Sequence, residues 1–134
     1  MENNIENIKL LIVDDEVKIC DLVKTILSKM GYTVFTALNT ETAMEAVKKE
    51  RPNLVLLDIR MGAESGLDVL PKIKEFDKNI KVVMLTAMED EENIRQSKSL
   101  GADDYMVKPL TADYLKNVIY QKLSYMIGRQ KDKK

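Results

Sequence analysis

The sequence predicts an α/β protein in which helices cover both faces of a five-stranded parallel sheet. Short apolar runs alternate along the chain with longer segments whose apolar residues recur at helical spacing. Strands that alternate with helices in this way pair in parallel and are covered on both sides. The chain has 134 residues and contains no internal repeat, low-complexity tract or interior linker, so we expect a single domain.

The strands are predicted where apolar or β-forming residues cluster. The first, at residues 8–13, is an apolar run that ends at Asp14 and Asp15. The third is a similar run that ends at Asp58. The strands that follow the first are predicted at residues 32–37, 54–57, 81–85 and 104–107.

The helices lie between these strands. The first has its apolar residues on one face and ends at Gly31, and Thr40 can cap a second that Arg51 and Pro52 end. The five helices are predicted at residues 19–30, 40–50, 68–76, 91–99 and 111 to about 128. Together the elements form a doubly wound sheet of the flavodoxin-like kind, within a domain at residues 1–128 that a basic tail at 129–134 follows.

Composition excludes several classes of protein. Hydrophobic residues make up 45% and charged residues 32% of the chain, which is typical of a globular protein. No apolar run approaches the ~20 residues of a membrane span, and the first residues do not resemble a signal peptide. The chain has no histidine and a single cysteine, Cys20, so catalysis by histidine, most zinc sites and an internal disulfide are excluded. We expect a cytoplasmic protein that, with a net charge of −1, binds neither membranes nor nucleic acid directly.

Polar residues follow four of the predicted strands. Asp14 and Asp15 follow the first strand, Asp58 the third, Thr86 the fourth and Lys108 the fifth. Any one of them could be only a helix cap or a turn residue. In an open parallel sheet, however, ligands bind at the carboxyl ends of the strands, where strand order reverses. We therefore expect these side chains to converge at one site.

The chemistry of that site follows from the residue types. Close carboxylates repel by roughly 4 kcal/mol per pair at an effective dielectric near 20, so they persist together when a cation neutralises them. Oxygen ligands with room for water suit Mg²⁺. A carboxylate can also attack phosphorus and form an aspartyl phosphate, whose oxygens a lysine and a hydroxyl can hold. The residues therefore predict a phosphoryl-transfer site.

Four motifs resemble those of a known family, the receiver domains of bacterial response regulators. They are LIVDDE at 11–16, DIRM at 58–61 with Gly66 eight residues after the aspartate, TA at 86–87 and GADDYMVKP at 101–109. The resemblance extends from about residue 8 to residue 127. Because the motifs occur in order and at predicted strand ends, their combination is very specific.

The resemblance implies a role for each site residue. Asp58 accepts a phosphoryl group from a histidine kinase or a histidine phosphotransfer protein. Mg²⁺ is held by Asp58, by Asp15 directly, by Asp14 through water and by the backbone carbonyl of Arg60. Thr86 and Lys108 hold phosphoryl oxygens, and the bond from Lys108 to the next residue, a proline, matches one that is usually cis in receivers. The protein is then not an enzyme, since it catalyses only its own phosphorylation and dephosphorylation.

The resemblance also implies how the signal leaves the domain. Tyr105 occupies the position of the family's switch aromatic, which turns inward as Thr86 moves toward the phosphoryl group. The output surface consists of the fourth helix, the fifth strand and the last helix, and it binds a downstream protein or an effector domain. The helix at 91–99 is poorly apolar, which makes it a plausible moving part. The sequence leaves open whether the chain is a complete regulator or part of a longer one.

Several positions depart from the family's usual pattern. Gly62 stands where most receivers have proline, which predicts a less restrained loop, and Leu110 stands where an aromatic residue is common. Arg60 and Met88 occupy positions that border the path of the hydrolytic water in this family. Neither side chain can take a proton from water, so we expect a long-lived aspartyl phosphate.

Two other classes of protein share parts of this pattern. Phosphatases of the haloacid dehalogenase type also combine a carboxylate nucleophile with Mg²⁺, but they carry Asp-x-Asp after the first strand. A flavodoxin-like cofactor binder needs a phosphate-binding loop at that place, where the acidic residues at 14–16 would repel an anionic cofactor. The order of the motifs favours a signalling switch over both.

Overall fold

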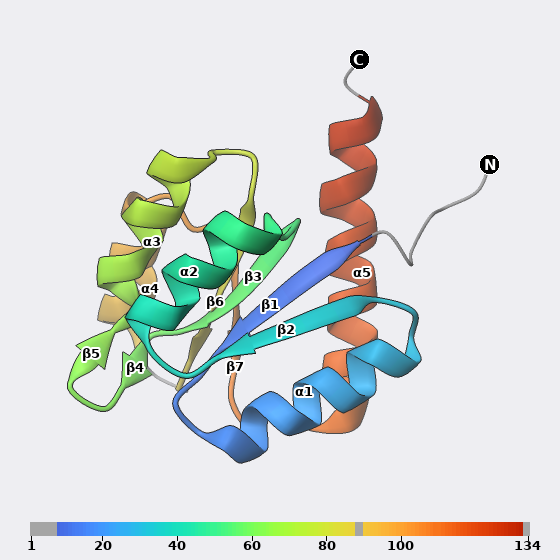
Figure 1. Cartoon of the computed structure of the whole chain (residues 1–134), viewed down its shortest axis with the longest axis horizontal. Helices are drawn as coiled ribbons and strands as arrows, with labels where there is room; N and C mark the ends of the chain where they lie inside the picture. The colour runs from blue at the N-terminus through green and yellow to red at the C-terminus, as the bar shows by residue number, and fades with distance from the viewer. Residues whose placement is uncertain (1–7, 88–89, 133–134) are drawn as a thin grey trace.

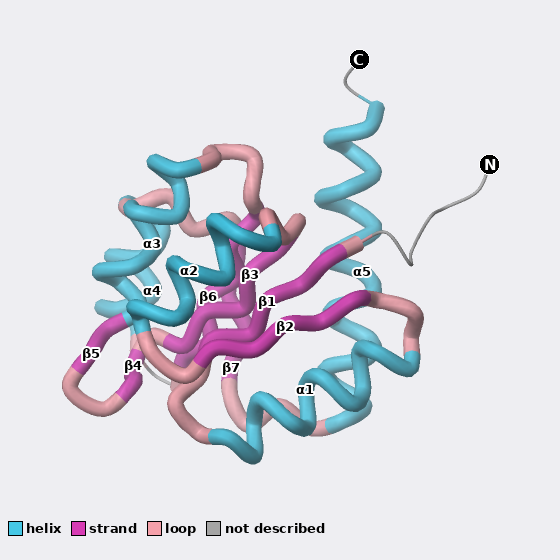
Figure 2. The backbone as a smooth tube through the Cα atoms, viewed as in Figure 1, coloured by secondary structure: helices cyan, strands magenta, loops and turns pink. Residues whose placement is uncertain are grey.

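The computed structural model describes residues 8–87 and 90–132 and confirms the predicted five-stranded parallel sheet. The strands lie side by side in the order β2-β1-β3-β6-β7, so strand order reverses at β1, which pairs with both β2 and β3 (Figures 1 and 2). Their bounds are β1 Lys9–Val13, β2 Thr33–Ala37, β3 Leu54–Asp58, β6 Lys81–Thr86 and β7 Asp104–Val107.

Five helices connect the strands and cover both faces of the sheet (Figure 1). They are α1 Val17–Lys29, α2 Thr40–Glu50, α3 Gly66–Phe76, α4 Glu91–Ser99 and α5 Ala112–Asp132. The predicted cap of α2 was wrong by one residue: the side chain of Asn39 caps the helix, and Thr40 is its first residue. The side chain of Ser65 caps α3, and each cap accepts a hydrogen bond from a first-turn amide. Arg51 ends α2 in the left-handed conformation, which agrees with the predicted stop before Pro52.

The core consists of two apolar layers, one on each face of the sheet. Along β1, Leu10 and Ile12 pack in the layer beneath α1 and α5, whereas Leu11 and Val13 pack in the layer beneath α2 and α3. This alternation follows from the two-residue period of a strand. Because both faces are buried, the central strands read in the sequence as continuous apolar runs.

One pair of short strands was not predicted. The chain after β3 forms a small antiparallel hairpin, in which β4 (Arg60–Met61) pairs with β5 (Glu64–Ser65). At its turn Gly62 has φ +61°, a value that proline, with φ fixed near −65°, cannot adopt. We had predicted a less restrained loop at Gly62, where most receivers have proline. The structure instead has a turn of defined geometry within a paired hairpin.

The last helix is longer than predicted. It was expected to end near residue 128, but it continues to Asp132, so most of the predicted basic tail is helical in its backbone. Figure 1 shows this end of α5 projecting beyond the sheet.

In the part of the chain that the structure describes, no helix is long and apolar enough to cross a membrane.

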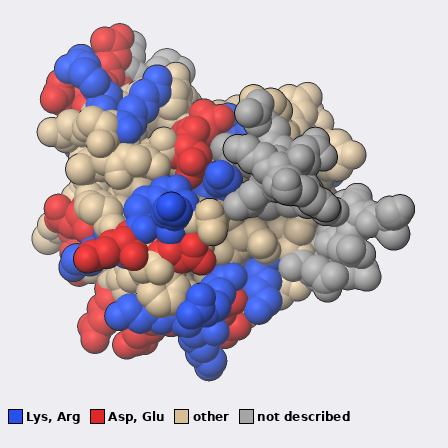
Figure 3. Space-filling view, turned by 90° about the horizontal axis from the view of Figure 1, so that it is seen from above, with Lys and Arg blue, Asp and Glu red and all other residues tan. Residues whose placement is uncertain are grey.

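Figure 3 shows the charged side chains on the face seen from above the view of Figure 1. Where the residues of that face are described, acidic and basic side chains are interspersed.

Candidate functional site

The structure brings together the carboxylates that were predicted to converge. Asp14 and Asp15 follow β1, and Asp58 is the last residue of the neighbouring strand β3. One carboxylate oxygen from each of the three residues lies within 4.8 Å of the others. Their place is the carboxyl edge of the sheet, beside the strand at which the order reverses.

Local hydrogen bonds fix Asp14. Its Oδ1 atom accepts the backbone N–H of Glu16 at 2.9 Å, which turns the chain from β1 into α1. Its backbone carbonyl lies 3.4 Å from the thiol of Cys20, one turn into α1. Burial and the charge of Asp14 raise the pKa of that thiol to about 11, so Cys20 is a neutral packed group.

Lys108 joins two of the carboxylates. Its Nζ atom donates to Asp14 Oδ2 at 2.9 Å and to Asp58 Oδ2 at 3.1 Å. The side chain of Asp14 is fully buried and that of Asp58 is 6% exposed, whereas the side chain of Lys108 is 27% exposed, so the carboxylates are shielded from water and the ammonium is reached by it in part. One ammonium thus serves two buried carboxylates, while the third, Asp15, is exposed.

The charges of this cluster perturb one another. Burial first and the negative charge of Asp14 second raise the pKa of Asp58 to about 6, and the nearby ammonium of Lys108 only partly offsets them. For Lys108 itself, burial alone would lower the pKa. The hydrogen bond that Lys108 donates to Asp14 and the negative charge of Asp58 outweigh burial, so the pKa of Lys108 is raised. The site therefore holds an excess of negative charge.

Thr86 lies beside the cluster. Its backbone carbonyl accepts the N–H of Lys108 at 2.8 Å, and its buried hydroxyl donates to the carbonyl of Ala87 at 3.3 Å. Tyr105 lies in β7, before Lys108 in the chain. The ammonium of Lys98 lies 5.7 Å from the centroid of its half-buried ring. The peptide bond between Lys108 and Pro109 is cis, as the motif implied.

The donor set fits a divalent cation. Three carboxylates at this separation offer the hard oxygen ligands that Mg²⁺ prefers, and the exposed Asp15 leaves room for water ligands. The backbone N–H of Arg60 donates to Asp58 Oδ1 at 3.2 Å, which holds the loop after β3 against the cluster. These residues are the ones that would hold Mg²⁺.

The sequence did not reveal two contacts of the β4–β5 hairpin. The guanidinium of Arg60 lies 3.8 Å from Asp90, the residue before α4, although the side chain of Arg60 is 78% exposed. Glu64 Oε1 accepts the backbone N–H of Thr40 at 2.9 Å and so satisfies the amino terminus of α2. For these two contacts the sequence offers one signal, the position of the acidic residue Asp90 just before a helix. Met88, which we placed near the path of water, lies outside the described residues.

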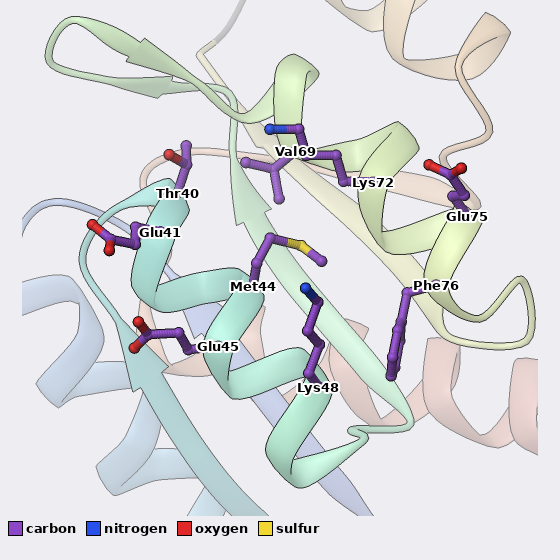
Figure 4. Close-up of a pocket in the computed structure, with 9 residues that line it drawn as sticks. All are labelled: Thr40, Glu41, Met44, Glu45, Lys48, Val69, Lys72, Glu75 and Phe76. Carbon is purple, nitrogen blue, oxygen red and sulfur yellow. The ribbon is translucent and has the colours of Figure 1, made fainter.

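A groove of about 670 Å³ lies between α2 and α3, away from the carboxylates. Figure 4 shows the side chains of Met44 and Val69 facing it from the two helices, with Phe76 at one end. Lysines and glutamates both line it, so its charge indicates no class of ligand. None of its lining residues belongs to the carboxylate cluster.

Comparison with known proteins agrees with this geometry. The model of the response regulator receiver domain matches residues 10–120. Sporulation initiation phosphotransferase F of Bacillus subtilis is 39% identical over 113 residues, which are 84% of this chain and 91% of that protein. The alkaline phosphatase synthesis transcriptional regulatory protein PhoP of the same bacterium is 36% identical over 105 residues, 78% of this chain but only 44% of its own length.

Solved structures show the same fold. The receiver domain of NtrX from Brucella abortus superimposes with a TM-score of 0.78 at 37% identity, over 86% of this chain and 98% of that one. A CheY-like response regulator receiver domain protein from Methanospirillum hungatei JF-1 gives 0.83 at 32% identity, over 91% of this chain and 98% of that one. The carboxylate cluster, the sheet that carries it and these matches lead to one conclusion: the chain belongs to the response regulator family and is a receiver domain of a two-component signalling system.

Proposed function

We propose that Asp58 is the residue that accepts the phosphoryl group, from a histidine kinase or a histidine phosphotransfer protein. The observation that carries this proposal is the position of Asp58 Oδ2, 3.1 Å from the ammonium of Lys108 and within the carboxylate cluster. A carboxylate oxygen of Asp58 attacks phosphorus, the bond from phosphorus to the donor's imidazole nitrogen breaks, and that nitrogen keeps the electron pair.

The other residues of the cluster would hold the metal and the phosphoryl oxygens. Mg²⁺ would be held by Asp15 directly, by Asp14 through water, and by Asp58 and the backbone carbonyl of Arg60. When bound, it neutralises charge on the transferring phosphoryl group. Lys108, which already contacts Asp58, then pairs with one phosphoryl oxygen, and the hydroxyl of Thr86 donates to another.

The proposed switch runs from Thr86 to Tyr105. To serve a phosphoryl oxygen, the Thr86 hydroxyl must leave the carbonyl of Ala87, and Tyr105 follows by turning inward. A shift from 1:99 to 99:1 needs about 5.5 kcal/mol. A hydrogen bond from Thr86 to a charged oxygen contributes only about 1.5–3 kcal/mol, so Lys108 and the metal must supply the remainder or the shift is partial.

The acceptor is tested by exposing the protein to acetyl phosphate and Mg²⁺ and measuring the intact mass. Wild type should gain one phosphoryl group, and Asp58→Asn should gain none. The matched control is Asp68→Asn, which alters an exposed aspartate in the first turn of α3 and should be phosphorylated as fully as wild type. An undiminished adduct on Asp58→Asn overturns the assignment.

The proposed output surface consists of α4, β7 and α5, around Tyr105. Its partner is a downstream protein or an effector domain, and the proposed compartment is the cytoplasm. The phosphoryl mimic beryllofluoride should change backbone hydrogen exchange in α4 and β7 as well as in the loops around Asp58. A change confined to those loops contradicts the switch.

A further inference from the structure

The carboxyl end of β7 requires a hydrogen-bond acceptor from outside the sheet. Among the described residues, β7 lies at the edge of the sheet and has β6 as its one neighbouring strand. The N–H of Lys108 points toward β6 and donates to the carbonyl of Thr86 at 2.8 Å. Because successive N–H groups along a strand point to opposite sides, the N–H of Val107 faces away from the sheet.

Tyr114 supplies that acceptor. Its hydroxyl oxygen accepts the N–H of Val107 at 3.0 Å, in a partly buried position. The ring packs against the apolar layer on the α1 and α5 side of the sheet, and the Tyr114 backbone N–H donates to Thr111 Oγ1 at 3.3 Å. Packing of the ring holds the phenol in place, and the hydrogen bond to Thr111 fixes the backbone at the start of α5.

We propose that Tyr114 is a positioning residue for Lys108. This proposal rests on the phosphoryl-site roles proposed above. Two successive peptide units lead from β7 to that lysine. The N–H of Val107, in the first unit, donates to Tyr114, and the N–H of Lys108, in the second, donates to the carbonyl of Thr86. Tyr114 thus pins the backbone from which the ammonium reaches Asp14 and Asp58, without touching the reacting atoms itself.

The physical consequence is specific to the lysine. Tyr114→Phe keeps the packed ring and removes the acceptor, which leaves the N–H of Val107 without its partner. The lysine backbone is then held on one side only. Asp14 and Asp15 stand on a different strand end, after β1, and keep their own hydrogen bonds. Loss of Tyr114 should therefore weaken the binding of phosphoryl oxygens and leave the metal ligands in place.

The test compares two affinities in Tyr114→Phe, at a temperature where circular dichroism shows the variant folded. Binding of beryllofluoride in saturating Mg²⁺, followed by fluorine NMR, should be about three- to tenfold weaker than in wild type, the range expected for one lost hydrogen bond. Mg²⁺ affinity, measured by calorimetry, should stay within twofold. The matched control is Tyr120→Phe, which removes a hydroxyl from an exposed tyrosine of the same helix and should change neither affinity.

Any of three results overturns the inference. They are an unchanged beryllofluoride affinity in Tyr114→Phe, an equal loss of Mg²⁺ affinity, and the same loss in Tyr120→Phe. An equal loss of Mg²⁺ affinity would indicate a purely structural role.

Hydrogen exchange of wild type tests the same contact without a variant. The N–H of Val107 should exchange slowly although it lies on a sheet edge. Rapid exchange there also contradicts the proposal. Failure of wild type to bind beryllofluoride at all, or undiminished binding by Asp58→Asn, contradicts the acceptor assignment instead.

Discussion

At the scale of single residues, the site has more negative charge than its one close cation can balance. Asp14 and Asp58 share the ammonium of Lys108, and Asp15 adds a third carboxylate within 4.8 Å. Such an arrangement costs stability in the absence of metal, because Asp58 loses hydration on burial and because like charges repel. The same excess charge is what attracts a divalent cation.

This cost predicts that Asp58→Asn stabilises the metal-free protein. At pH 7 in EDTA, the free energy of unfolding should rise by roughly 1–3 kcal/mol, since each unit of pKa shift corresponds to about 1.4 kcal/mol. The fold raises the pKa of Asp58 to about 6 from the 3.8 that is usual for an aspartate, so wild type regains stability as the pH falls from about 7 to about 4. The gain should therefore shrink toward pH 4.

Urea unfolding at several pH values measures this difference. Asp68→Asn serves as the control, because its carboxylate is exposed and should show no such gain. A variant no more stable than wild type at pH 7 would mean that the three carboxylates are not in conflict.

Gly66 allows the chain to pass close behind the acceptor. A Cβ atom at this position would lie 2.2 Å from the backbone carbonyl oxygen of Asp58, a contact that requires the backbone to shift. At Gly62 a Cβ would meet Asp15 at an ordinary 3.7 Å, and only the positive φ opposes a side chain. Gly66→Ala should thus cost at least about 2–3 kcal/mol, and Gly62→Ala about 1–2 kcal/mol.

Chemical denaturation of both variants tests the comparison, and beryllofluoride binding shows whether the acceptor has moved. If Gly66→Ala is as stable as Gly62→Ala and binds normally, the close approach of α3 to Asp58 is not tight.

At the scale of elements, α4 is the helix with the weakest attachment. Of its residues only Ser97 is buried, and the ammonium of Lys98 lies over the ring of Tyr105. Asp90, the residue before the helix, forms an ion pair with Arg60. A helix with so little buried apolar surface has a low cost of movement. The low burial agrees with the poorly apolar sequence of this helix, and its movement stays a prediction.

The contact between Lys98 and Tyr105 should stabilise the resting orientation of the ring. A partly exposed cation–π contact contributes about 0.5–1 kcal/mol. If Tyr105 must turn inward for activation, Lys98→Met favours the active state and should tighten beryllofluoride binding by about two- to fivefold. Lys24→Met, an exposed lysine of α1, is the control for charge alone. Unchanged or weaker binding in Lys98→Met would show that this contact does not hold the ring back.

At the scale of the whole molecule, the sequence predicted what depends on periodicity and strand ends. The apolar runs before Asp14 and Asp58 located two strands, and parallel pairing then required both carboxylates to meet at one edge. Each of the five main strands and five helices follows from the same reasoning. The order of strands could be expected only by resemblance, since no local pattern says which strand pairs with which.

The features that were missed depend on contacts without a period. Strands of two residues, such as β4 and β5, are too short to show alternation. The hydrogen bond from Val107 to Tyr114 joins a strand end to a helix through a single hydroxyl. In the sequence alone, nothing distinguishes this tyrosine from one that only packs in the core. The ion pair of Arg60 with Asp90 joins two loops that only the fold brings together.

The most direct test of the central claim is to locate the phosphoryl group chemically. Borohydride reduces an aspartyl phosphate to homoserine, so phosphorylated protein that is reduced, digested and sequenced by mass spectrometry carries a mark at the acceptor. The geometry predicts homoserine at position 58 alone, in a yield that depends on Mg²⁺. Homoserine at Asp14 or Asp15, or a mark at Asp58 that forms equally well in EDTA, would contradict the assignment of acceptor and metal ligands.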